Sequence, residues 1–266
     1  MIWPLFKYNI KTNRFLWFLL LAVMFMYYSI IISMFDPENI EALTKMLELF
    51  PKELMDAMGF SQFGTTLLTF VVGYIYGFLI FLFPLILTVV INHKLVASMV
   101  DKGSMAYLLS APFSRIKVAL TQAISGLVLI TVFLTTTTLC ALVVSELLFP
   151  GEMEVWMFIK INIYAIILYW AISGIVFFGS AIADDSKVSL GIGVGIPVLF
   201  LVIQMLAGAG KDFKWLENFT MYSLFNPEMM IEGDGFVWIG MAALFAIALV
   251  FYSAGIWYFN RKNLYI

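Results

Sequence analysis

Few side chains in this sequence could carry out catalysis or hold a metal ion. The chain has one histidine, His93, and one cysteine, Cys140, which lies in an apolar run and has no second cysteine to pair with. A metal site would need several such ligands close together, so we expect no metal and no cofactor bound by this chain. The glycine-rich stretch 191–195 lacks the Lys-Ser/Thr of a phosphate-binding loop, and no such loop occurs elsewhere in the sequence. We therefore expect that the chain is not an enzyme and does not itself bind ATP.

Charged side chains are almost absent from the apolar runs. Only Glu146 and Lys160 come near such a run, and both lie toward one end of it, where a charged head can reach the membrane interface. A proton- or sodium-coupled carrier, or an enzyme acting inside the membrane, needs ionisable or nucleophilic groups within the apolar region. The scarcity of such groups argues against both classes, which stay as our alternative.

Most of the sequence consists of long apolar runs that predict helices. Hydrophobic residues make up 63% of the 266 residues and charged residues 12%, whereas a soluble domain has roughly 45–50% and 25%. An apolar run of about 20 residues is long enough to cross the hydrocarbon core of a bilayer as a helix. We therefore predict an all-α membrane protein with one transmembrane domain over residues 1–266. Its six predicted spans cover about 15–34, 64–91, 118–148, 156–181, 188–207 and 237–260.

The distribution of basic residues predicts the orientation. With six spans, one side of the membrane holds residues 1–14, 92–117, 182–187 and 261–266, and the other side holds most of the acidic residues. The first side carries ten Lys and Arg residues: Lys7, Lys11, Arg14, Lys94, Lys102, Arg115, Lys117, Lys187, Arg261 and Lys262. Basic loops stay in the cytoplasm. We predict a multi-pass protein of the cell membrane with both termini in the cytoplasm.

Three segments outside the spans have helical patterns. Residues 1–14 mix basic residues with Trp3 and Phe6, which favours an amphipathic helix at the membrane surface rather than a signal peptide. In the outer loop Glu38–Met58, apolar residues recur every three or four positions, which predicts a helix on the outer surface. The outer loop Gly208–Phe236 mixes apolar anchors with acidic residues and favours short interfacial helices.

The inner loop between spans two and three has start and stop signals for a short helix. Gly103 can end one helical segment, and Ser104 can cap the next. Pro112 disfavours helix at the residue before it, and Ser114 can cap span three. An apolar stripe lies between them, formed by Met105, Leu108 and Leu109. We predict a short, rigid amphipathic helix. A soluble partner that displaces this helix would also move the two spans that it connects.

This loop resembles that of the ABC-2 type transporter permease family. The resemblance rests on Asp101-Lys102-Gly103 followed by Tyr107-Leu108-Leu109-Ser110-Ala111-Pro112-Phe113-Ser114-Arg115, and on the layout of six spans with cytoplasmic ends. It implies a subunit that pairs with a second permease copy and docks on a cytoplasmic ATP-binding cassette ATPase, which would bind the ATP and Mg²⁺. It implies no nucleic-acid partner. The residues implied to couple the two subunits are Asp101, Lys102, Gly103, Tyr107, Leu108, Leu109, Pro112, Ser114 and Arg115.

The resemblance also implies a direction and a class of cargo. Small bacterial members export amphipathic peptides or drugs, and the size and apolar character here are similar to the permeases that export phenol-soluble modulins. The alternatives are an ion-coupled carrier or intramembrane enzyme acting without an ATPase partner, and a sensory or scaffold subunit.

Span five contains small residues and a proline. Small residues four apart let helices approach closely, and a proline can form a hinge. We predict a helix-packing or hinge role for Gly191, Gly195 and Pro197.

Overall fold

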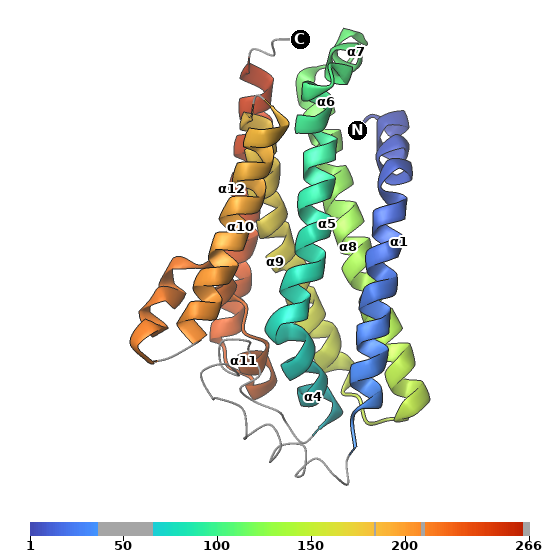
Figure 1. Cartoon of the computed structure of the whole chain (residues 1–266), viewed down its shortest axis with the longest axis vertical. Coiled ribbons are helices and arrows are strands. Elements are labelled where there is room, and N and C mark those ends of the chain that lie inside the picture. The colour runs from blue at the N-terminus through green and yellow to red at the C-terminus, as the bar shows by residue number, and fades with distance from the viewer. Residues whose placement is uncertain (37–65, 184, 209–210, 263–266) are drawn as a thin grey trace.

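The computed structural model describes residues 1–36, 66–183, 185–208 and 211–262, and this part of the chain is helical without a strand. It contains six helical segments long and apolar enough to cross a membrane, as predicted. They are α1 (Trp3–Ser33), the segment from α4 (Leu67–Tyr74) through η1 (Ile75–Leu79) and α5 (Ile80–Leu95) to α6 (Ala97–Asp101), α8 (Arg115–Leu148), α9 (Val155–Ile182), α10 (Ser186–Gly208) and α12 (Phe236–Arg261). Figure 1 shows them running along one common direction.

The connecting segments divide between the two ends of this bundle. The N-terminus, α6, α7 (Ser104–Ser110) and the end of α12 lie at one end (Figure 1). We call this the basic end, because all ten Lys and Arg residues of the predicted inner side belong to the segments that meet there. The other end holds the 3-10 helices η2 (Lys211–Phe219) and η3 (Met221–Leu224) and the short helix α11 (Pro227–Glu232). The predicted helix over residues 38–58 lies outside the described residues.

Helix α9 forms the centre of the bundle. It is the most deeply buried of the six spans and packs against α5, α8, α10 and α12. Small residues let α9 and α12 approach closely: a Cβ atom on Gly255 would lie 2.9 Å from a ring carbon of Phe177. In a membrane such close packing, rather than exclusion of water, holds helices together.

The interfacial helix expected over residues 1–14 does not form as a separate element. Instead α1 continues without interruption from Trp3 to Ser33. A 31-residue helix is about 46 Å long, which exceeds the ~30 Å of a hydrocarbon core. Helix α1 is therefore longer than such a core is thick, and its basic residues Lys7, Lys11 and Arg14 lie in the part nearer the basic end.

Polar contacts to α8 explain this correction. Leu5, Asn9 and Asn13 recur every four residues and are all buried. The side-chain amide of Asn9 donates hydrogen bonds to Gln122 Oε1 at 2.6 Å and to Ser125 Oγ at 2.9 Å. Because a buried amide is stabilised by pairing, these bonds hold the start of α1 along α8 and continuous with the rest of the helix.

Span two contains an irregular turn and a proline. The π-helix η1 precedes α5, and Pro84 lies inside α5. Pro84 has no N–H to donate to the carbonyl of Ile80, four residues earlier. The hydroxyl of Tyr169 on α9 donates to this carbonyl at 2.7 Å and also lies 3.0 Å from the carbonyl oxygen of Phe81. Tyr169 thus replaces the hydrogen bond that the proline removes.

Replacing Tyr169 by phenylalanine should destabilise the bundle by about 1 kcal/mol, because it leaves the Ile80 carbonyl unpaired without changing the packed volume. A loss of this size lowers the midpoint of thermal unfolding by roughly 2–4 °C in a chain of this length. The matched control is Tyr27→Phe, since the Tyr27 hydroxyl has no hydrogen bond within the described part of the chain. Equal midpoints for the two variants would contradict this role of Tyr169.

Candidate functional site

The connection between α5 and α8 has the predicted boundaries. Gly103 has a φ of 70°, the left-handed conformation that favours glycine, and separates α6 from α7. The extended backbone of Ala111, before Pro112, ends α7. Ser114 caps α8, because its hydroxyl accepts a hydrogen bond from the N–H of Lys117.

Ser104 does not have the predicted capping role. Gly103 occupies the N-cap position of α7, and Ser104 is the first helical residue. The Ser104 hydroxyl donates to the carbonyl of Met99 at 3.1 Å. It therefore ties the start of α7 back to α6.

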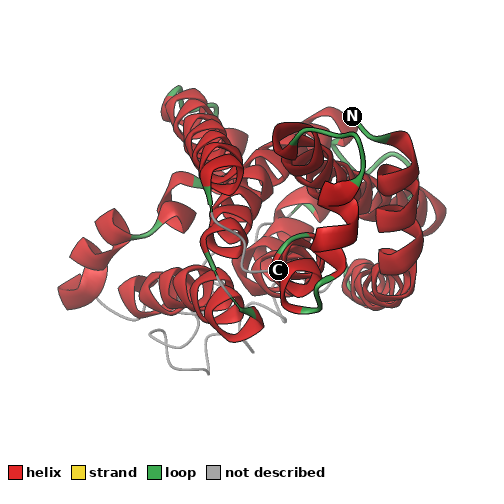
Figure 2. Cartoon of the chain, turned by 90° about the horizontal axis from the view of Figure 1, so that it is seen from above, coloured by secondary structure: helices red, strands yellow, loops and turns green. Residues whose placement is uncertain are grey.

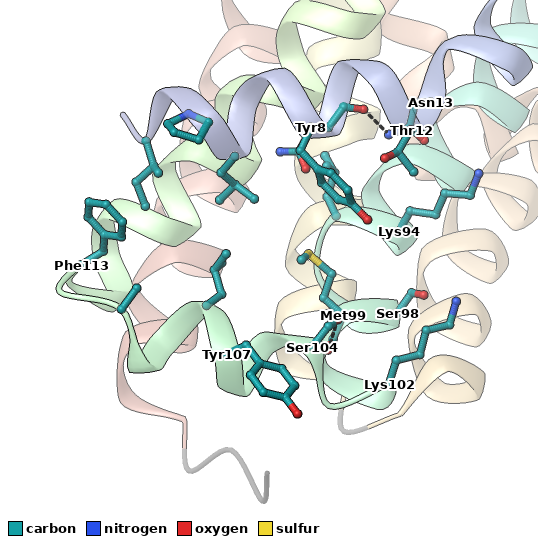
Figure 3. Close-up of a pocket in the computed structure, with 17 residues that line it drawn as sticks. Tyr8, Thr12, Asn13, Lys94, Ser98, Met99, Lys102, Ser104, Tyr107 and Phe113 are labelled. Atoms are coloured by element: carbon teal, nitrogen blue, oxygen red, sulfur yellow. Dashed lines mark hydrogen bonds between the residues drawn. The ribbon is translucent and has the colours of Figure 1, made fainter.

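The two faces of α7 differ in exposure. Met105 is fully buried, and Leu108 and Leu109 are half-buried against the hydrophobic core. Tyr107 is 83% exposed, and Figure 3 shows its ring pointing away from the groove. Two of the predicted coupling residues thus hold α7 on the bundle, while the aromatic ring of Tyr107 is exposed.

Hydrogen bonds tie both ends of this connection to other helices. Before α7, the Asp101 carboxylate accepts a hydrogen bond from the Ser186 hydroxyl at 2.6 Å, at the start of α10. After α7, Arg115 Nη1 donates to the backbone carbonyl of Lys262 at 2.8 Å, at the end of α12. The ammonium group of Lys262 donates to the carbonyls of Ile182 and Ala183, at the end of α9.

We call Asp101, Ser186, Arg115 and Lys262 the basic-end clamp. It joins the two ends of the α5–α8 connection to the ends of α9, α10 and α12. The contact at α9 is favourable because the last carbonyls of a helix lack intrahelical partners and carry partial negative charge. In the sequence Lys262 indicates only the orientation, and no motif there signals its contact with α9.

A second set of polar contacts crosses the bundle near the basic end. The Asn92 side-chain amide on α5 donates to Ser173 Oγ on α9 at 2.9 Å, and Ser173 Oγ lies 2.7 Å from the Tyr252 hydroxyl on α12. All three residues are buried. Such paired polar groups fix the register of neighbouring spans. They were missed in the sequence, because Asn and Ser within apolar runs do not reveal their partners.

A groove of about 600 Å³ opens at the basic end between the first turns of α1, the α5–α6 junction and α7 (Figure 3). Its apolar lining includes the buried Leu5 and Leu95. Tyr8 extends from α1 into the groove, and Lys94 and Lys102 lie along one edge of it. The groove therefore combines an apolar interior with positive charge at its rim.

The small residues of span five lie on different faces of α10. Pro197 lies on the buried face with Gly193, where a Cβ atom on Gly193 would be 3.2 Å from a side-chain carbon of Val176. Gly191 and Gly195 are exposed, and a Cβ atom at either position would meet no other atom within 4 Å. Among the described residues Gly193 is thus the packing glycine of the three, and the helix-packing or hinge role of Gly191 and Gly195 stays a prediction.

Comparison with known proteins places the whole chain in one group. The model of the family described as "ABC-2 family transporter protein" matches residues 6–264. No curated protein matches the sequence. The matched residues include the complete α5–α8 connection and all six spans except the first three residues of α1.

Proposed function

Because the chain belongs to the ABC-2 family of transporter proteins, we propose that it is the membrane-spanning permease of an exporter powered by ATP hydrolysis on a separate cytoplasmic cassette ATPase. ABC-2 permeases are the membrane subunits of ABC transporters and are not themselves catalytic. This chain would therefore supply the pathway, and its partner would bind ATP and Mg²⁺.

The observation that carries this proposal is the combination of an exposed α7 with anchored ends. Tyr107 on α7 is available to a soluble protein, while the basic-end clamp joins the same loop to three spans. Docking at α7 would thus pull directly on α9, α10 and α12. A second copy of the chain would complete the pathway, and the bundle would be oriented with its basic end in the cytoplasm.

We propose an amphipathic or apolar cargo, with membrane-active peptides such as phenol-soluble modulins as the first candidates. The support is the similarity in size and apolar character described above, together with the scarcity of charged residues within the spans. Met and Phe are abundant, with 16 and 26 residues, and such flexible, polarizable side chains adapt to varied apolar ligands.

The direct test is reconstitution in liposomes with the cognate cassette ATPase. The permease alone should not hydrolyse ATP, the two proteins should copurify, and amphipathic peptides should stimulate ATP hydrolysis and be moved across the membrane. Transport by this chain alone, driven by an ion gradient, would overturn the proposal in favour of an ion-coupled carrier. Copurification without flux would indicate a sensory or scaffold subunit.

Gly103→Ala should weaken the association with the ATPase, with Gly151→Ala as the matched control. Both glycines have a positive φ, 70° and 78°, and open space around the position of a Cβ atom. Each variant should therefore lose a similar ~1–2 kcal/mol of stability from backbone strain alone. Only Gly103 orients α7, so only its variant should yield less copurified ATPase at equal permease expression. Equal yields from the two variants would contradict the role of α7.

A further inference from the structure

The groove at the basic end fits a ligand with an apolar body and an anionic head. Leu5, Leu95 and Leu108 form apolar parts of its lining, whereas Lys94 and Lys102 stand along one edge. Neither ammonium group forms an ion pair or hydrogen bond within the part of the chain that the structure describes. An anionic group at this rim would gain two charged partners at once.

The length and charge of α1 would place the groove at the level of the lipid headgroups. Helix α1 is longer than the hydrocarbon core is thick, and its first turns form one wall of the groove. Lys7, Lys11 and Arg14 on the same segment mark the polar side of the boundary. Tyr8 extends into the groove (Figure 3), and tyrosine favours an environment with one apolar and one wet side.

We propose that this groove binds an anionic phospholipid of the adjacent leaflet, with its phosphate at Lys94 and Lys102 and its acyl chains toward Leu5, Leu95 and Leu108. Basic pockets between spans are known to bind such headgroups. A zwitterionic phospholipid would place a positive ammonium group beside the two lysines and gain less. A soluble phosphate would leave the apolar lining empty.

The occupant would link two elements that the chain itself joins weakly here. One wall of the groove is α1 and the opposite wall is α7, and the lipid would contact both. Occupancy should therefore steady α7 against the bundle. Binding does not depend on the proposed transport function, because it is measured on the permease alone.

The experiment uses the full-length permease purified in detergent and titrated with dioleoyl-phosphatidylglycerol, dioleoyl-phosphatidylcholine or inorganic phosphate. Native mass spectrometry counts the retained lipids, and thermal unfolding reports stabilisation. We expect one phosphatidylglycerol to be retained most tightly and to raise the unfolding midpoint, with no comparable effect of phosphatidylcholine or phosphate. Equal stabilisation by phosphatidylcholine would overturn the proposal, and so would equal stabilisation by inorganic phosphate.

Two variants locate the site. Lys94→Gln with Lys102→Gln should weaken this binding roughly 30-fold, as expected for two basic groups near an anionic headgroup. The matched control, Lys117→Gln with Lys187→Gln, removes the same charge from the basic end outside the groove and should retain the lipid. Ser98→Phe keeps both lysines but fills the groove, and it should also release the lipid while unfolding at the unliganded midpoint. Retention of the lipid by the lysine pair variant, or equal loss in both lysine pairs, would refute the assignment.

Discussion

Replacing Tyr107 by glutamate should abolish copurification of the cassette ATPase while leaving the permease folded. The side chain is 83% exposed and makes no hydrogen bond within the described residues, so its loss should change the stability of the permease by less than about 0.5 kcal/mol. At an interface the same change removes an aromatic anchor and buries a charge. Such positions cost at least about 2 kcal/mol, which is a roughly 30-fold loss of affinity.

Tyr107 is a sharper probe than its neighbours. Leu108 and Leu109 pack against the core of the permease, so charged residues there would disturb the fold as well as the interface. The control is Trp215→Glu, which changes another exposed aromatic residue, 58% exposed, at the opposite end of the bundle. Intact pairing and transport in the Tyr107 variant would refute α7 as the docking element.

Replacing Lys262 by methionine should separate ATP hydrolysis from transport. The variant keeps the backbone carbonyl that accepts from Arg115, but it loses the ammonium group that bonds to the last carbonyls of α9. The ATPase should therefore still dock on α7, whereas its movement should no longer reach α9. We expect at least a tenfold fall in peptide transported per ATP hydrolysed, with copurification unchanged.

Two further variants distinguish this coupling role from a general loss of charge. Lys262→Arg can still donate to the same carbonyls and should restore most of the transport. Arg261→Met removes the adjacent charge, which stacks on Trp257 with 4.5 Å between the guanidinium carbon and the ring centroid, and should transport normally. If Lys262→Met and Arg261→Met behaved alike, Lys262 would have no specific part in coupling.

The helix boundaries within the α5–α8 connection were predictable from sequence. Gly103, Pro112 and Ser114 act through their own backbone preferences or through an adjacent N–H, and such effects depend on only a few neighbouring residues. Ser104 was misassigned because Gly103 took the capping position and the carbonyl of Met99 offered another partner. Because α7 starts one residue earlier than predicted, Ser104 is its first helical residue and not its N-cap.

The start of α1 was misassigned for a longer-range reason. Its pattern of basic and aromatic residues suits a membrane surface, and nothing in residues 1–14 shows that Asn9 has Gln122 and Ser125 as partners. The same limit hid the contact of Lys262 with α9 and that of Tyr169 with the carbonyl exposed by Pro84. In each case the partner is far away along the chain.

The sequence by itself determined that this is a membrane protein with six spans, because length and hydropathy decide whether a helix can cross a bilayer. It also determined which segments share an end, since basic and acidic residues separate cleanly once the spans are drawn. Only the tertiary structure decided that α1 stands along α8, that the ring of Tyr107 is exposed on α7, and that Lys262 joins α12 to α9. These features depend on which side chains meet once the helices pack, and the spacing of residues along the chain does not reveal those partners.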